Sequence, residues 1–240
     1  MKNLPWLTVD QMREVDRAMM EDYGISLLQM MENAGRSLAR LAVTRFLGGD
    51  PRGKRVTALC GTGGNGGGGL VGARHLHNRG ARVTVVTTRP DEDYRGVPAR
   101  QLAILRNVGV PVAPVDRMAA LPPADLLLDA VIGYGLSGAP HGAAAEMIRR
   151  ANAHPAPVLS LDVPSGLDAD TGAAHDPAVR ATATLTLALP KTGLRPPEAR
   201  AFTGEGFLAD ISVPPELYVA LGLADTPAPF FFRDAILRLW

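Results

Sequence analysis

A glycine-dense stretch between an apolar run and a helical pattern constrains this chain more than any other feature. Seven glycines fall between positions 61 and 69, after the strand-like run 55–59 and before the helical pattern 70–78. Glycine lets a bare main chain approach a ligand closely and adopt positive φ, and a following helix directs its positive end to the same point. The pattern predicts a loop whose N–H groups hold the phosphate of a nucleotide. The alternative is a tight strand-to-helix turn with no ligand.

The second predicted strand argues against an ordinary NAD-dependent dehydrogenase. The spacing of Gly61, Gly63 and Gly66 satisfies the dinucleotide fingerprint, but any glycine run can match that spacing. A dehydrogenase also places an acid at the end of the second strand to bind the adenine ribose. Here that strand ends in Thr88-Arg89, and the first acid comes later, after a proline. The glycine stretch therefore predicts nucleotide binding without predicting hydride transfer.

Composition and charge exclude several classes of partner. The 240 residues carry a formal net charge of +1, which gives no electrostatic case for nucleic acid or for an acidic membrane surface. No apolar stretch approaches the roughly 18 residues of a transmembrane helix, and the first residues lack the pattern of a secretory signal. The single cysteine, Cys60, excludes an intrachain disulfide. We therefore expect a cytoplasmic protein.

From position 54 the chain alternates strand-like and helical patterns, which is typical of right-handed parallel βαβ units. Continuous apolar runs at 126–128 and 158–161 predict strands covered on both faces, and hence an α/β fold with a mostly parallel central sheet. The predicted helices cover residues 9–22, 26–46, 70–78, 98–107 and 142–153, and the predicted strands cover residues 55–59, 82–86, 112–115, 126–129, 158–162, 184–189 and 206–212.

The chain is predicted to form one domain over residues 1–240. Two N-terminal helices (9–47), the first with Thr8 as its N-cap, precede an α/β core (54–213). A C-terminal tail (214–240) places apolar side chains behind a proline break. We expect this tail to dock on the body or on a second subunit.

Polar side chains follow three of the predicted strands, at the edge where open parallel sheets bind ligands. Asn65 lies in the glycine stretch, Asp129 ends one apolar strand, and Asp162 and Ser165 follow the next. A solvated turn would explain either acid alone, but two at neighbouring strand ends favour a functional site. The oxygens of Asn65, Asp129 and Ser165 form a hard-oxygen set suited to a Group 1 or 2 cation. Asp162 is then the candidate for proton transfer.

Lys191 and a pair of histidines are weaker candidates for function. Lys191 ends another predicted strand and could contact phosphate or be a solvated surface group. His75 and His77 lie two positions apart on a predicted helix, so their side chains point in different directions and cannot share a metal. We interpret both as helix-surface histidines.

Four motifs occur in a fixed order along the chain. They are the glycine stretch continued by residues 70–76, then the segments 128–135, 162–168 and 189–194. With the paired N-terminal helices and the segment 210–214, they cover nearly the whole chain and closely resemble the YjeF N-terminal domain family, whose enzymes are the NAD(P)H-hydrate epimerases. The resemblance implies a Rossmann-like three-layer α/β/α sandwich, usually a homodimer. It also implies interconversion of the R and S forms of hydrated NADH and NADPH, so that a separate dehydratase can restore the nucleotide.

The same resemblance assigns roles to individual residues. Asn65, Asp129 and Ser165 match the ligands of a potassium ion, one per subunit, and Asp162 matches a substrate-contacting and catalytic aspartate. The residues that match the substrate cradle are Gly64, Asn65, Gly66, Gly67, Gly68, Gly133, Tyr134, Gly135, Leu136, Ser137, Gly138 and Ala139, together with Asp162.

The glycine stretch departs from the family pattern at three positions. Thr62, Gly64 and Gly68 stand where the family usually has proline, asparagine and aspartate. The missing aspartate removes a negative charge beside the nucleotide, and the added backbone freedom costs roughly 1 kcal/mol per residue to order. Two alternatives therefore stay open beside the epimerase. One is a nucleotide-binding or scaffold protein with weakened catalysis, and the other is an isomerase or hydrolase for another phosphorylated metabolite.

Overall fold

A single mostly parallel sheet runs through the protein, as the computed structural model shows for residues 4–225, 230–231 and 233–240. Its eight strands lie in the order β3-β2-β1-β4-β5-β6-β7-β8, and the described strand pairs are parallel except β7 with β8. The strands are β1 (Arg55–Cys60), β2 (Arg82–Thr87), β3 (Val112–Pro114), β4 (Leu126–Ala130), β5 (Val158–Leu161), β6 (Ala183–Leu187), β7 (Glu205–Ala209) and β8 (Ile236–Arg238). The predicted α/β fold with a mostly parallel sheet is confirmed.

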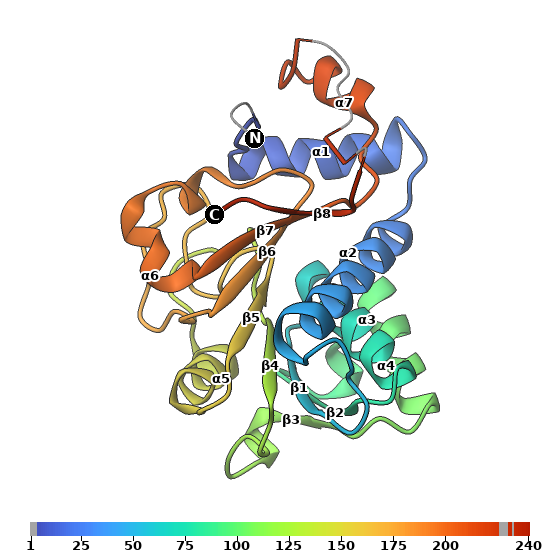
Figure 1. Cartoon of the computed structure of the whole chain (residues 1–240), viewed down its shortest axis with the longest axis vertical. Coiled ribbons are helices and arrows are strands. Elements are labelled where there is room, and N and C mark those ends of the chain that lie inside the picture. The colour runs from blue at the N-terminus through green and yellow to red at the C-terminus, as the bar shows by residue number, and fades with distance from the viewer. Residues whose placement is uncertain (1–3, 226–229, 232) are drawn as a thin grey trace.

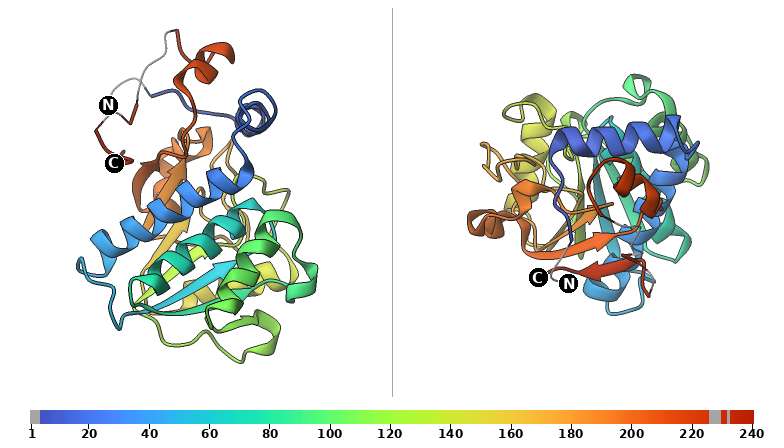
Figure 2. Two further views of the ribbon diagram at one scale, coloured as in Figure 1. Left: turned by 90° about the vertical axis from the view of Figure 1, so that its right-hand side faces the viewer. Right: turned by 90° about the horizontal axis from the view of Figure 1, so that it is seen from above.

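Helices cover both faces of this sheet, so the three-layer α/β/α arrangement is also confirmed (Figure 1). Helices α2, α3 and α4 lie on one side and α5 on the other, while α1 crosses the end of the sheet (Figures 1 and 2). The helices are α1 (Val9–Glu21), α2 (Leu27–Leu41), α3 (Gly64–Asn78), α4 (Gly96–Asn107), α5 (Gly142–Ala153), α6 (Arg200–Thr203) and α7 (Pro215–Ala220). A π-helical turn, Ala42–Phe46, continues α2 to the end of the predicted long helix.

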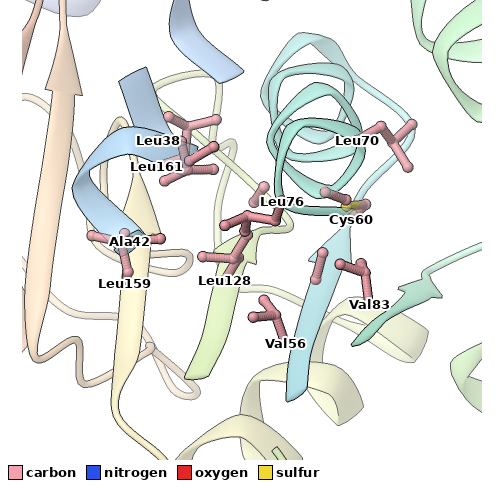
Figure 3. Close-up of a cluster of buried hydrophobic side chains, with 14 of the residues drawn as sticks. Leu38, Ala42, Val56, Cys60, Leu70, Leu76, Val83, Leu128, Leu159 and Leu161 are labelled. Carbon is pink, nitrogen blue, oxygen red and sulfur yellow. The ribbon is translucent and has the colours of Figure 1, made fainter. Parts of the chain in front are cut away.

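The apolar strands pack on two separate cores because neighbouring side chains point to opposite faces. Leu126 and Leu128 lie in the core beneath α2, α3 and α4, whereas Leu127 lies in the core beneath α5. Figure 3 shows part of the first of these cores, with Leu38 of α2 and Leu161 of β5 among its labelled side chains. Cys60 is fully buried in the same core, consistent with a packing role.

The start of α3 corrects the prediction for the glycine stretch. The expected helix begins at Leu70, but the observed helix begins at Gly64, so five of the seven glycines are helical. All of these residues lie in the described part of the chain, and none of the seven glycines adopts a positive φ. Intrinsic propensity disfavours glycine in a helix by about 1 kcal/mol per residue, and tertiary packing overrides it here.

Close approach of neighbouring elements explains why α3 is built from glycine. A Cβ at Gly67 would lie 2.6 Å from Sδ of Met31 on α2, and a Cβ at Gly69 would lie 2.4 Å from Cβ of Ala130 on β4. Gly35 of α2 approaches α3 in the same way, since its Cβ would lie 2.7 Å from the carbonyl oxygen of Gly68. Glycine is therefore required mainly for helix packing, and not for a left-handed loop.

Two polar contacts also join this pair of helices. His75 of α3 lies 2.7 Å from Glu32 of α2, and Arg74 lies 2.6 Å from the same carboxylate. The interpretation of His75 as a surface histidine is wrong, because only 16% of its side chain is exposed. Burial is the main cause of a lowered pKa for His75.

Both ends of the described chain dock on the body. Thr8 caps α1 as predicted, in a capping box with Gln11. The tail adds the unpredicted strand β8 to the edge of the sheet, and the Trp240 ring stacks on Trp6 with centroids 6.3 Å apart. Docking of the tail on the body is thus confirmed for its described residues, whereas positions 226–229 and 232 of the predicted apolar tail lie outside them.

Over residues 4–225 and the described part of the tail, no helix combines the length and apolar character needed to cross a membrane.

Candidate functional site

A cavity of about 580 Å³ opens beyond the carboxyl ends of β1, β4 and β5. These strands are neighbours in the sheet, and the chain order reverses between β1 and β4, which is where open α/β sheets bind ligands. Helix α1 lies across this edge (Figures 1 and 2). Elements on every side contribute lining residues, among them Met12, Arg13, Asp16, Met31, Gly63, Gly64, Asn65, Gly68, Thr88, Gly133, Tyr134, Gly135, Asp162 and Lys191.

Gly133, in the turn after β4, brings Asn65 and Asp162 together. A Cβ built on Gly133 would lie 2.9 Å from Oδ2 of Asp162 and 3.0 Å from Cγ of Asn65. Because glycine has no side chain, Gly133 leaves room for both the Asp162 carboxylate and the Asn65 amide. Asn65, which follows β1, and Asp162, which follows β5, therefore lie close together on either side of the turn after β4, as expected for neighbouring parallel strands.

The structure divides the predicted substrate cradle into two parts. The residues that line the cavity are Gly64, Asn65, Gly68, Gly133, Tyr134, Gly135 and Asp162. Gly66 and Gly67 instead pack against protein, Gly66 against the carbonyl oxygen of Gly61 and Gly67 against Met31. Leu136, Ser137, Gly138 and Ala139 continue the turn beyond the residues that line the cavity.

Asp162 is held at the cavity wall by contacts to both carboxylate oxygens. Its Oδ2 accepts a hydrogen bond from the backbone N–H of Tyr134 at 2.9 Å, and its Oδ1 lies 2.5 Å from Nζ of Lys191. The residue directly follows β5 and has a φ of +68°, a left-handed conformation that aspartate adopts more readily than most residues. An uncommon backbone conformation held by its surroundings is frequent at functional sites.

Lys191 is the main site residue whose environment the sequence leaves open. Its side chain is fully buried, so the solvated-surface alternative is wrong. The ammonium pairs with Asp162, donates to the Leu187 carbonyl at 2.8 Å, and lies 5.9 Å from the centre of the Tyr134 ring. The position of this lysine directly after an apolar strand and a proline marks it as a candidate, but the sequence does not show whether its side chain points into the protein or into solvent.

Helix α1 supplies a second acid that sequence reasoning missed. The Tyr134 hydroxyl donates to Oδ2 of Asp16, which ties the turn after β4 to the helix that covers the cavity. Burial raises the pKa of Asp16, and burial also raises the pKa of Tyr134. The signal was its spacing, since Asp16 lies four positions after Met12 and so faces the same side of α1 as a buried methionine.

Asp129 lies beneath the cavity with no exposed surface. Its Oδ2 accepts hydrogen bonds from the Ser160 hydroxyl at 2.7 Å and the Ser165 backbone at 2.9 Å. Its Oδ1 accepts from the Ser165 hydroxyl at 2.6 Å and more weakly from the Val131 backbone at 3.3 Å. Burial raises the pKa of Asp129, and the hydrogen bonds from Ser165 oppose that rise. All four donors are uncharged, so none of them neutralises the carboxylate.

The oxygen donors around Asp129 fit a hard Group 1 or 2 cation. The Ser165 hydroxyl donates a hydrogen bond to Asp129 and accepts one from the backbone N–H of Ile132. The next residue, Gly133, lies beside the Asn65 side chain. Neither the amide oxygen nor the amide nitrogen of Asn65 has a hydrogen-bond partner, although both atoms are buried. Buried polar atoms without partners are costly, and a bound ion would give the amide oxygen a partner. A buried carboxylate with neutral donors and an unpartnered amide oxygen together match such an ion.

Fold and site together define a class of protein. It is an α/β protein with a ligand cavity at the switch point of a parallel sheet, in which a glycine helix, an ion-paired aspartate and a set of oxygen donors converge. The second strand ends in Thr87 and is followed by Thr88 and Arg89, so the ribose-binding acid of a dehydrogenase is replaced by other residues.

The chain belongs to the family described as YjeF-related protein N-terminus, whose model matches residues 27–193. The chain is 48% identical to an NAD(P)H-hydrate epimerase of Dehalogenimonas lykanthroporepellens, over 93% of the chain and 89% of that protein. It is 36% identical to an NAD(P)H-hydrate epimerase of Rhodopirellula baltica, over 89% of the chain and 87% of that protein.

A longer relative and a solved structure also match the chain. The chain is 39% identical to a bifunctional NAD(P)H-hydrate repair enzyme of Pyrobaculum aerophilum, over 88% of the chain but 43% of that enzyme. Its fold matches the crystal structure of the yeast protein ynu0 with a TM-score of 0.83 and 26% identity, over 98% of this chain and all of that one.

Proposed function

We propose that this chain is an NAD(P)H-hydrate epimerase, an isomerase that interconverts the R and S forms of hydrated NADH and NADPH. The observation that carries the proposal is the cavity itself: the Asp162 carboxylate, ion-paired with Lys191, and the start of the glycine helix α3 line one cavity of about 580 Å³. Two relatives named NAD(P)H-hydrate epimerase, each aligned over nearly its full length, support the same reaction.

The geometry suits proton transfer next to a bound nucleotide. The hydrated ring carries a hydroxyl group on a carbon beside the ring nitrogen, so proton transfer can loosen that hydroxyl or open the ring, and closure on the other face inverts the centre. Asp162 is the group for this transfer, because its carboxylate lines the cavity in a fixed orientation. Gly63, Gly64 and Asn65 at the start of α3 line the same cavity, and the N–H groups of this helix end would bind the pyrophosphate.

A potassium ion, one per subunit, would be held by Asn65, Asp129 and Ser165. The unpartnered amide of Asn65 and the uncharged surroundings of the Asp129 carboxylate support this assignment. When bound, the ion would supply a positive charge that neutralises Asp129 and connects the turn after β4 to the start of α3.

The remaining expectations concern the protein's surroundings. We propose a cytoplasmic homodimer that works with a separate dehydratase specific for the S hydrate. Bifunctional relatives named for NAD(P)H-hydrate repair support a link between this family and a second repair activity.

Replacement of the family residues by Gly64 and Gly68 leaves the cavity open. A Cβ at Gly64 would have Met31 Cε as its nearest neighbour at 4.0 Å, and a Cβ at Gly68 would approach the Leu161 side chain at 2.8 Å. Neither position touches the pair formed by Asp162 and Lys191, which supports retained catalysis over a scaffold role.

A coupled assay tests the proposal. Pure R hydrate is supplied with an excess of an S-specific dehydratase, and NADH absorbance is followed with and without this chain. Complete and accelerated recovery of NADH supports the epimerase. A stall at the rate of spontaneous epimerisation would favour the nucleotide-binding or scaffold alternative, or an isomerase or hydrolase for another phosphorylated metabolite.

A further inference from the structure

The buried ion pair at the cavity wall assigns a role to a residue beyond those named above. We propose that Lys191 is a positioning residue for epimerisation: its ammonium holds the Asp162 carboxylate in one orientation, as an anion ready to accept the proton of the ring hydroxyl. The inference rests on the proposed function and deepens it.

The surroundings of Lys191 leave its ammonium little freedom. Three acceptors face its three N–H groups: Oδ1 of Asp162 at 2.5 Å, the Leu187 carbonyl at 2.8 Å and, more weakly, the Thr186 hydroxyl at 3.5 Å. The side chain has no exposed surface. Because its donors are already used, Lys191 is not free to bind a phosphate of the nucleotide.

The backbone around Lys191 is fixed as well. The segment before α1 forms a parallel bridge with it, in which the Leu7 N–H donates to the Pro190 carbonyl at 2.8 Å and the Thr192 N–H donates to the Leu7 carbonyl at 2.9 Å. The position of the ammonium is therefore set by the same N-terminal segment that places α1 over the cavity.

The charge of Lys191 matters because Asp162 is only 3% exposed. A buried carboxylate without a partner is strongly disfavoured as an anion, and an ammonium in contact stabilises the negative charge. Buried ion pairs often contribute little to stability compared with apolar side chains of similar volume. The position of the ion pair at the cavity wall therefore points to a role in the reaction. Asp162 accepts the proton of the ring hydroxyl while the bond between that carbon and the ring nitrogen breaks, the electron pair stays on the nitrogen, and the carbon becomes a carbonyl. Attack of the nitrogen on the other face of the carbonyl re-forms the ring, and Asp162 returns the proton to the oxygen.

A double-mutant cycle tests the proposal, with kcat and KM measured for the R hydrate. Lys191→Met keeps the length of the side chain and removes its charge, and Lys54→Met is the matched control at an exposed lysine. We expect Lys191→Met to lower kcat by roughly 10²-fold or more with little change in KM, because acid–base groups contribute about 10² to 10⁴-fold. Lys54→Met should match the wild type.

The second arm uses Asp162→Asn, in which the charge that Lys191 balances is absent. If Lys191 acts through Asp162, the double variant Lys191→Met/Asp162→Asn will have the same kcat as Asp162→Asn alone. This comparison also holds where Lys191→Met by itself folds poorly, since the double variant buries no unpaired charge.

Three results overturn the inference. They are wild-type kcat in a folded Lys191→Met variant, a rise in KM with kcat unchanged, and losses that multiply independently in the double variant. If the wild-type chain has no epimerase activity, the proposed function fails and the role of Lys191 fails with it. An active wild type with an unaffected Lys191→Met variant overturns the inference alone.

Discussion

Substitution of Gly133 by alanine tests the geometry of the site with a single added methyl group. The new Cβ would lie 2.9 Å from Oδ2 of Asp162, whereas ordinary contacts begin at 3.4 Å, so one group must move by about 0.5 Å (3.4 − 2.9). Asp162 is held on both oxygens by Tyr134 and Lys191, so this shift strains its orientation. A misplacement of about 1 Å costs on the order of 10²-fold in rate, and half of it predicts a loss of roughly 10-fold in kcat.

Gly135→Ala is the matched control for this substitution. Gly135 lines the same cavity two residues further along the turn, and a Cβ there would have no neighbour within 4 Å. The assay measures kcat on the R hydrate together with the melting temperature of each variant. We expect Gly133→Ala to lose kcat while losing only about 1 kcal/mol of stability, and Gly135→Ala to keep its kcat and melting temperature, with any effect of the added methyl group on substrate binding appearing in KM. Equal kcat values for the two variants would refute the geometric reasoning.

Three further outcomes follow. Gly35→Ala should cost about 1–3 kcal/mol in urea unfolding, since its Cβ would lie 2.4 Å from Cβ of Val71, while Gly64→Ala, with open space, should not destabilise α3. Hydrogen bonds from the Arg55 side chain lower the pKa of Asp125 to about 2. A lowered pKa of this kind stabilises the folded state at pH values above the pKa of the unfolded chain, and this stabilisation is lost as the pH falls through the pKa of the folded state. The melting temperature of Asp125→Asn should therefore lie below the wild type at pH 6 and converge with it near pH 2, a difference worth at most about 1 kcal/mol after solvent screening; a gap that persists at low pH would contradict this. Potassium chloride should raise the melting temperature above that in choline chloride, and Asn65→Ala should abolish the difference; an equal response in the variant would count against the proposed ion site.

The sequence predicted the sheet well because its strands are marked by strong local patterns. Leu126, Leu127 and Leu128 alternate between two buried cores, and a run without polar residues is the expected sign of that arrangement. The predicted start of α3 was wrong because glycine disfavours a helix locally. The close approach of α2 and β4 explains why Gly67 and Gly69 are nevertheless helical. Strand β8 was missed because its pairing with β7 joins distant segments.

The site residues that follow strands were predicted from the sequence. The contacts that depend on how distant segments pack together were missed. Asn65 and Asp162 meet at Gly133 because neighbouring parallel strands end at one edge, which topology makes predictable. The burial of Lys191 depends on the segment before α1, and the contact between Asp16 and Tyr134 depends on how α1 crosses the sheet. The local pattern marks both positions, but it does not say which residues they contact.

The most direct test is to follow a pure R hydrate by a method that resolves both epimers, with the wild-type chain and with Asp162→Asn. We expect the wild type to bring R and S to equilibrium far faster than buffer alone, and Asp162→Asn to be slower by roughly 10²-fold or more. A wild-type rate equal to that of buffer, or an Asp162→Asn variant as fast as the wild type, would contradict this expectation.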